Sequence, residues 1–358
     1  MGATPTDLAS LELPELEKLF EQRGLPAFRA RQVFRWIWKR GITNFAAMTD
    51  LGRALAARLE EEFAVSTPII VRRDVSEDAT QKFVLKLSDG KQIEAVFIPD
   101  TPAQTFCIST QVGCAMGCAF CLTGKMGLVR HLSAGEIAGQ ARVLAHTLDL
   151  HNQPFNIVLM GMGEPLHNYD ETMKALRILN DEHGLDVGPR RVTLSTVGLV
   201  PMLEKLAQEK LMPNLAISLH ATTEQQRAAI VPPAKKYLLR DILDVCRRFP
   251  LAKRSRITFE YVLLAGVNDT PDDARRLARL LADIKAKVNL IPLNAAPGIP
   301  FERPSAARVD AFARILADKR ITVSVRKSRG RDIRAACGQL IVEGQTRSPG
   351  QRLAAALQ

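Results

Sequence analysis

Three cysteines in one short loop constrain this chain more than any other feature. Cys114, Cys118 and Cys121 follow the spacing CxxxCxxC within the run CAMGCAFC. Thiolates are soft ligands that suit iron–sulfur clusters, zinc or copper(I), and a structural zinc site usually takes four ligands. Three thiolates on a four-iron cluster leave one iron without a protein ligand. On such a cluster the open iron could bind a substrate, and the tight spacing disfavours a trio of ordinary buried or disulfide-bonded cysteines.

Beyond Gln104 the sequence alternates short β-rich runs with amphipathic helices, which predicts a parallel sheet. One helix is expected to begin with a capping box of Ser133 and Glu136, and another at Pro271, because proline suits a first helical turn. About six or seven such units fit a full or partial barrel. The predicted strands lie near 106–110, 156–160, 191–196, 215–219, 257–264, 288–293 and 322–326.

The rest of the chain divides around this barrel. Residues 1–66 show helical periodicity and predict a small helical domain, whose Trp36 and Trp38 are interpreted as core residues, with contact to nucleic acid as the alternative. Residues 67–103 alternate with period two around Asp89-Gly90 and predict a hairpin linker. Within it, Glu94 is placed on the solvent face. The barrel is expected over 104–343, followed by a flexible tail, 344–358.

Charge and composition bound the class of protein. The 358 residues carry a formal net charge of +11, so the surface should attract a polyanion such as RNA or DNA. The absence of a signal peptide and of a long apolar run predicts a cytoplasmic protein, and six cysteines predict metal chemistry in a reducing compartment. Cys246 is interpreted as a core residue. Basic clusters occur at 190–191, 235–236, 247–256 and 326–334.

Polar loops follow the predicted strands, and function gathers at the carboxyl ends of strands in parallel barrels. The first strand is expected to run into the cysteine loop and the second into GMGEPLHN, residues 161–168, whose glycines let a ligand approach the backbone. A lone polar residue at a strand end is usually structural, but several around one cluster indicate a binding site. The remaining strand-end residues are Ser195, Thr196, Ser218, His220 and Asn294.

The cysteine motif and GMGEPL resemble the radical S-adenosylmethionine (SAM) superfamily. The resemblance implies one [4Fe–4S] cluster on the three cysteines of the loop, with SAM bound to the open iron. It also implies a SAM pocket lined by residues at matching motif positions, namely Glu164, Pro165, Ser195, Ser218, Leu219, His220 and Asn294.

Cys337, in VRKSRGRDIRAACGQL, is interpreted as a nucleophile, since nearby cations favour the thiolate. With this segment the whole chain is similar to the RlmN family. That resemblance implies methylation of adenosine C2 in 23S rRNA, at the peptidyl-transferase centre, and in tRNA, next to the anticodon. It also implies an external electron donor resembling flavodoxin. The chain is expected to be a monomer.

The resemblance further implies the chemistry. Cys337 takes a methyl group from one SAM, and a second SAM is cleaved to a 5′-deoxyadenosyl radical that activates this methyl group for addition to C2. The matched positions assign proton acceptance to Glu94 and release of the RNA to Cys107, through a disulfide with Cys337. From the residues alone, Cys107 is interpreted as a core residue.

Three alternatives remain at this point. A relative that methylates C8 of the same adenosine shares the cluster and both reactive cysteines, and product analysis separates the two. A non-enzymatic iron–sulfur protein that binds RNA or passes electrons would have a fully ligated cluster, and the cysteine loop lacks a fourth cysteine. A radical SAM enzyme acting on a small metabolite would leave the charge and Cys337 unused.

Overall fold

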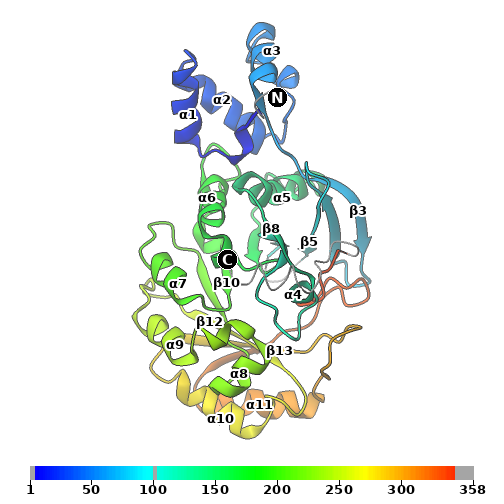
Figure 1. Cartoon of the computed structure of the whole chain (residues 1–358), viewed down its shortest axis with the longest axis vertical. Helices are drawn as coiled ribbons and strands as arrows, with labels where there is room; N and C mark the ends of the chain where they lie inside the picture. Colours follow the sequence, from blue (N-terminus) through cyan, green and yellow to red (C-terminus); the bar gives the residue numbers. More distant parts are fainter. Residues whose placement is uncertain (1–4, 100–102, 343–358) are drawn as a thin grey trace.

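The computed structural model describes residues 5–99 and 103–342. A small helical part at the amino-terminal end stands above a larger α/β part in Figure 1. Within the described ranges, no helix combines the length and apolar character needed to cross a bilayer. The predicted flexible tail, 344–358, lies outside the described residues.

The helical part packs around large aromatic side chains. Trp36 and Trp38 are only 6% and 0% exposed, which confirms their interpretation as core residues. A short parallel pair of strands, β1 and β2, joins the beginning of this part to its end. Its elements are β1 (Thr6–Asp7), α1 (Leu13–Gln22), α2 (Ala27–Trp38), α3 (Arg53–Glu62) and β2 (Phe63–Ala64).

A ten-stranded sheet forms the body of the α/β part, in the order β14-β13-β12-β11-β10-β9-β6-β5-β4-β3. The strands from β6 to β14 in this order are parallel, and the predicted strands are all found. They are β6 (Thr105–Cys107), β9 (Asn156–Leu159), β10 (Val192–Thr196), β11 (Asn214–Ser218), β12 (Ile257–Leu263), β13 (Ala286–Pro292) and β14 (Thr322–Val325).

The predicted hairpin extends the same sheet. Strands β3 (Ile69–Val75), β4 (Gln81–Lys86) and β5 (Gln92–Ile98) run antiparallel, and β5 pairs antiparallel with β6. Gly90 has φ +81°, which the predicted turn requires. Because β14 and β3 are the two edges, the sheet stays open within the described residues and the barrel is partial.

Helices follow one another around the outside of the sheet in Figure 1. The predicted capping box is present, since Ser133 Oγ accepts from the Glu136 amide at 3.2 Å. Pro271 is the first residue of its helix, as expected, and Thr270 is the N-cap. Cys246 is 2% exposed, which confirms its place in the core. The helices are α5 (Ala134–Thr147), α6 (Tyr169–Asn180), α7 (Val200–Leu206), α8 (Glu224–Ile230), α9 (Leu239–Arg248), α10 (Pro271–Leu280) and α11 (Ala306–Asp318).

Short elements complete the fold near the cysteine loop. β7 (Gln111–Cys114) and β8 (Gly127–His131) form a separate antiparallel pair, and α4 (Leu122–Met126) lies between them in sequence. Single 3-10 turns occupy Leu8–Ser10, Phe45–Ala47, Pro165–Asn168, Pro189–Arg191 and Pro232–Lys235.

Candidate functional site

The cysteine loop is held by its own small sheet. The first barrel strand, β6, ends at Cys107, and a second strand, β7, follows it and ends on Cys114, the first cysteine of the loop. Gly113 makes the tight pairing of β7 with β8 possible. Its φ is +77°, and a Cβ there would lie 1.9 Å from the Gly127 carbonyl oxygen. The β7–β8 pairing thus holds the start of the loop, and the loop ends at Cys121, the N-cap of α4.

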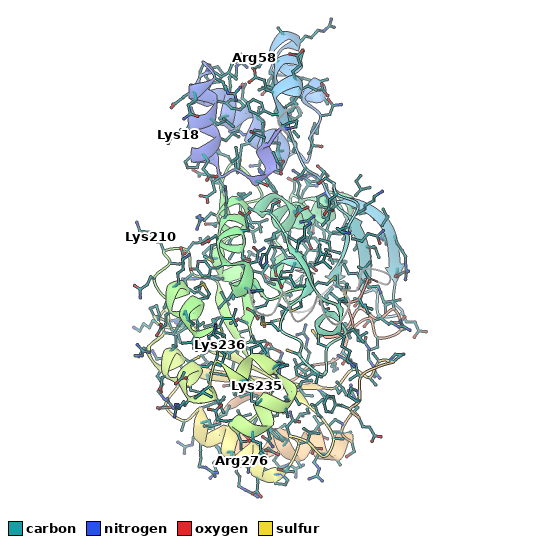
Figure 2. The ribbon with its side chains drawn as sticks, viewed as in Figure 1. Lys18, Arg58, Lys210, Lys235, Lys236 and Arg276 are labelled. Carbon is teal, nitrogen blue, oxygen red and sulfur yellow. The ribbon has the colours of Figure 1, made fainter. Side chains whose placement is uncertain are left out.

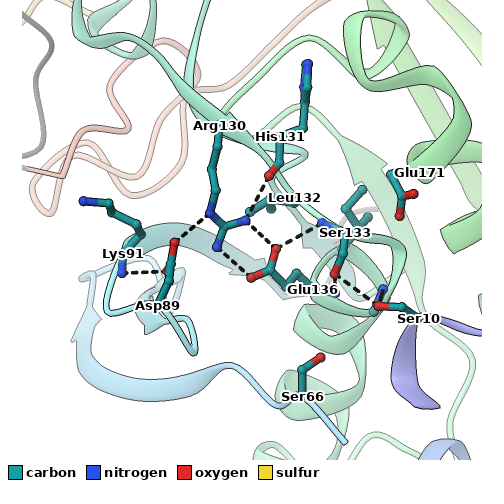
Figure 3. Close-up of polar contacts among 12 residues, drawn as sticks. Ser10, Ser66, Asp89, Lys91, Arg130, His131, Leu132, Ser133, Glu136 and Glu171 are labelled. Carbon is teal, nitrogen blue, oxygen red and sulfur yellow. Dashed lines mark hydrogen bonds and ion pairs between the residues drawn. The ribbon is translucent and has the colours of Figure 1, made fainter. Parts of the chain in front are cut away.

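Arg130 ties this small sheet to the rest of the molecule (Figure 3). Its guanidinium donates to both carboxylate oxygens of Glu136, at 2.7 and 2.8 Å, and to Asp89 in the hairpin turn at 2.8 Å. Hydrogen bonds from Arg130 hold the pKa of Asp89 below its usual value. The charged network anchors β8 to both the start of α5 and the β4–β5 turn, so it fixes the base of the cysteine loop.

The three loop thiols line one cavity at the carboxyl ends of the barrel strands. Burial raises the pKa of Cys114, Cys118 and Cys121, so they become thiolates only beside added positive charge, which iron supplies. Among the described residues, no three His, Cys, Asp or Glu side chains converge on a point where one metal ion would bind. A four-iron cluster binds each thiolate through a different iron, so this spread donor set fits the cluster.

The loop after β9 closes the same cavity. Glu164 accepts from the amides of Leu166 at 3.0 Å and Val197 at 2.9 Å, and its own amide donates to Gln111 at 2.9 Å. Burial nevertheless raises the pKa of Glu164 to about 7, because it outweighs these hydrogen bonds. Pro165 then begins a 3-10 turn. The loop is thereby fixed to both β7 and the end of β10.

Neighbouring strands add hydroxyl and imidazole groups. Ser195 Oγ and Ser218 Oγ lie 3.3 Å apart. His220 has φ +61°, and its Nδ1 accepts from the Val262 amide at 3.0 Å. Burial lowers the pKa of His220 to about 3, so its ring is neutral at ordinary pH. Its ring meets Phe120 of the cysteine loop edge-on at 4.8 Å.

Asn294 connects the cavity to the carboxyl-terminal segment. Its Nδ2 donates to the Cys337 carbonyl oxygen at 3.2 Å, while its buried Oδ1 has no hydrogen-bond partner among the described residues. The Leu122 amide donates to Gly338 at 2.8 Å from the opposite side. Cys337 is thus held between the cysteine loop and the end of β13, and Asn294 retains a free acceptor for a ligand.

A second cavity, of about 740 Å³, meets the first at Cys337. Cys107 and Arg326 also line it. Arg326 lies close to both thiols: the pKa of its guanidinium is raised, first by Cys337 and then by Glu260 and Cys107. Burial raises the pKa of Cys107 to about 12, and Arg326 partly offsets this rise. A single half-buried cation therefore interacts with two thiols.

Sequence reasoning missed two charged residues of this site, the buried Glu260 and the half-buried Arg326. Glu260, in the apolar run ITFEYVL, accepts from Asn289 Nδ2 at 3.2 and 3.1 Å and lines the first cavity. A carboxylate amid the apolar residues of a central strand was the available signal. Arg326 was predicted only as part of the basic cluster 326–334, because no local pattern distinguishes it from Lys327 or Arg329.

Glu94 is not on the solvent face, so that prediction from the residues is wrong. Its side chain is buried, pairs with Lys82 Nζ at 3.1 Å and accepts from the Ile341 amide at 2.8 Å. Burial raises the pKa of its carboxyl group, although Lys82 opposes the shift. Glu94 lines a third cavity, separate from the one that holds Cys107 and Cys337.

The sulfurs of all six cysteines, including Cys107 and Cys337, are free thiols within the described residues. The expected disulfide is therefore not supported. Of the predicted SAM pocket, Pro165 and Leu219 do not line the first cavity. The predicted residues that do line it, besides the three loop cysteines and Cys337, are Glu164, Ser195, Ser218, His220 and Asn294.

Comparison with known proteins identifies the parts of the chain. Residues 6–65 match the ribosomal RNA large subunit methyltransferase N-terminal domain, and residues 108–281 match the radical SAM superfamily. The superfamily match implies a [4Fe–4S] cluster and SAM. The crystal structure of a radical SAM methyltransferase from Sphaerobacter thermophilus is 44% identical, with a TM-score of 0.90, over 94% of this chain and 99% of that chain.

Curated relatives cover nearly the whole length. The dual-specificity RNA methyltransferase RlmN of Geobacter sulfurreducens is 49% identical over 94% of this chain and 92% of its own length. The protein of the same name from Pelobacter propionicus is 48% identical over 94% and 95%. Identity at this level over nearly the whole of both chains shows the family, and the chain belongs to the RlmN family of radical SAM RNA methyltransferases.

Proposed function

We propose that this protein methylates C2 of adenosine in 23S rRNA, at the peptidyl-transferase centre, and in tRNA, next to the anticodon. The observation that carries the proposal is the position of Cys337, which lines both the cavity of the loop cysteines and the larger cavity that holds Cys107. A methyl group on the Cys337 sulfur can therefore be activated from the cavity of the loop cysteines and can contact a nucleobase in the larger cavity.

Cys114, Cys118 and Cys121 would hold the cluster, which would supply the electron for reductive cleavage of SAM. The acceptor Oδ1 of Asn294 and the hydroxyls of Ser195 and Ser218 are available to bind and orient SAM in the same cavity. Buried, neutral His220 would support this wall without adding charge. Pro165 and Leu219, which do not line the cavity, would contribute by fixing the backbone of the loops that carry Glu164 and His220.

Cys337 would first accept a methyl group by displacement. Its sulfur forms the new carbon–sulfur bond, the sulfonium carbon–sulfur bond of SAM breaks, and S-adenosylhomocysteine leaves. Arg326 lies close to this sulfur, and the interaction raises the pKa of the guanidinium, so this group remains a cation beside the reacting atoms. The asparagine contact at the Cys337 carbonyl keeps the sulfur between the two cavities.

The larger cavity would admit the target adenosine. Arg190, Arg191 and Lys327 are exposed at its rim, while Cys107 and Cys337 lie on its inner wall. The rim cations suit the phosphates on either side of a base that has been turned out of its stack. We assign Cys107 to release of the RNA, since it shares this cavity with Cys337.

Glu94 would accept the proton lost from C2. The Ile341 amide and Lys82 hold its carboxylate in a neighbouring cavity, so this role requires the segment between Cys337 and Ile341 to shift when RNA binds.

We further propose that residues 1–66 form an accessory RNA-binding domain, that residues 67–103 form a hairpin extension, and that residues 104–343 form the catalytic barrel. The enzyme would be monomeric and cytoplasmic, and an external flavodoxin-like protein would donate the electron.

Substitution of the central thiol tests the proposal. Cys337→Ala should abolish methylation of RNA while leaving the iron content and visible absorption of the protein unchanged. Cys246→Ala, which removes a buried thiol in α9 remote from both cavities, is the matched control and should retain activity. Substantial methylation by Cys337→Ala would contradict the assigned role.

A further inference from the structure

A basic pocket lies where the helical part meets the α/β part, away from both reactive cavities. It has a volume of about 610 Å³. Arg35, Lys39 and Arg40, from the end of α2 and the residues after it, form one wall. The opposite wall comes from two loops of the α/β part, one after α5 and one after α6, and consists of His151, Asn152, Glu182 and His183.

The cations of this pocket are not neutralised. Among the described residues, no carboxylate oxygen lies within 4.0 Å of the side-chain nitrogens of Arg35, Lys39 or Arg40. Other arginines of the same helical part are paired: Arg31 with Glu17, and both Arg23 and Arg58 with Glu62. The pocket therefore carries an excess of positive charge, with three cations and the single carboxylate of Glu182.

Close packing fixes the two walls relative to each other. A Cβ at Gly41 would lie 2.6 Å from the His146 ring, and one at Gly184 would lie 3.1 Å from Trp38 Cβ. His146 in turn stacks on His151 at 4.5 Å, which places the latter ring in the pocket. The end of α5 thus packs against the residues that follow α2, and the loop after α6 packs against α2 itself, so the two walls of the pocket are held together.

The guanidinium of Arg40 is also held in one orientation before any ligand binds. Its guanidinium lies over the Trp36 ring, 4.2 Å from the centroid, and the Trp36 indole N–H donates to Asp50 at 2.5 Å. Stacking on a buried, hydrogen-bonded indole limits the orientations of an otherwise exposed arginine. Less conformational entropy is then lost when the guanidinium binds an anion.

We infer that this junction pocket binds neighbouring backbone phosphates of the RNA substrate, about one for each of its three cations, at a distance from the base that is methylated. A phosphate accepts hydrogen bonds from guanidinium and ammonium groups and matches the excess positive charge. The site would hold the RNA to both parts of the protein at once. This inference rests on the proposed function, because it takes the polyanion to be the RNA that the barrel methylates.

Binding measured against salt concentration tests the inference. The probe is an unmodified bacterial tRNA transcript, with the full chain as the protein. Arg35→Ala/Lys39→Ala/Arg40→Ala should weaken binding about tenfold or more at low salt, since each phosphate contact adds to the electrostatic attraction. It should also flatten the slope of log K against log salt by about 3. The KM for tRNA should rise while kcat at saturating tRNA stays unchanged.

The matched control is Arg23→Ala/Arg31→Ala/Arg58→Ala, which removes the same charge from the same part of the protein (Arg58 is labelled in Figure 2). Its salt slope should change by less than about 1, because those cations are already paired. Glu182→Gln removes the opposing carboxylate and should tighten binding, a gain that loss of fold cannot produce.

Equal salt slopes for the pocket and control variants, or unchanged binding by Glu182→Gln, would overturn the inference. If the wild-type chain in the same preparation still methylates tRNA, only the inference about the pocket fails and the proposed function is unaffected. If the wild-type chain neither binds nor methylates tRNA, the proposed function fails first.

Discussion

The Asn294 side chain donates a hydrogen bond to the Cys337 carbonyl oxygen at 3.2 Å, and the two residues line both cavities of the barrel. The contact joins the end of β13 to a segment more than forty residues later in the chain. It places the thiol proposed to carry the methyl group beside a free amide oxygen that faces the same space.

Asn294→Leu should slow methyl loading of Cys337 at least about tenfold, because it removes both the hydrogen bond to Cys337 and the free acceptor. Intact-protein mass spectrometry after incubation with SAM measures the loading. Asn289→Leu, within β13 and without the contact to Cys337, is a useful comparison. Equal loading by Asn294→Leu and the wild-type protein would remove Asn294 from the site.

Arg326→Met should reduce methylation and shift the activity profile to higher pH. The guanidinium lowers the pKa of Cys107 against the effect of burial, so without it more alkaline solution is needed to reach the same fraction of Cys107 thiolate. Arg326→Lys keeps a cation and should restore part of the activity at neutral pH. An Arg326→Met profile with an unshifted pH dependence would show that this cation acts only in packing.

Lys82→Met should destabilise the fold by about 3 kcal/mol, because it leaves the buried carboxylate of Glu94 without its cation. Urea unfolding of the single and double variants provides the measurement. Lys82→Met/Glu94→Gln should recover part of the loss, since the uncompensated charge is gone. Additive destabilisation in the double variant would argue against a coupled pair.

His220 should make stability depend on pH below neutrality. Its folded pKa of about 3 lies below the ordinary value of 6.5, so the contribution is full above pH 6.5 and is lost as pH falls toward 3. Between pH 7 and pH 5 this amounts to about 2 kcal/mol. His220→Asn keeps an acceptor and suits the positive φ, so urea unfolding should show a smaller loss over this range. An identical loss in the variant would assign the pH dependence to other groups.

Local patterns were sufficient to predict much of the fold. Alternating β-branched runs located the parallel strands, and the Asp89-Gly90 turn located the hairpin. The cysteine loop and the polar strand ends were predicted to meet, and the first cavity brings most of them together. These features depend on short stretches of sequence, where periodicity and turn chemistry act directly.

The features that were missed depend on contacts distant in sequence. Glu94 is buried because the Ile341 amide, 247 residues away, meets its carboxylate. The separate β7–β8 sheet depends on close approach of Gly113 to Gly127, which no periodic pattern reveals. The role of Arg326 follows from its meeting with Cys107 across the barrel. Charge pattern alone could not separate it from its exposed neighbours.

Analysis of the methylated nucleoside tests the central claim most directly. The iron-reconstituted protein is incubated without oxygen with SAM, a reductant and unmodified bacterial 23S rRNA, and the digested nucleosides are separated and identified by mass. The proposed function predicts 2-methyladenosine. 8-Methyladenosine, or no methylated base despite cleavage of SAM, would contradict it.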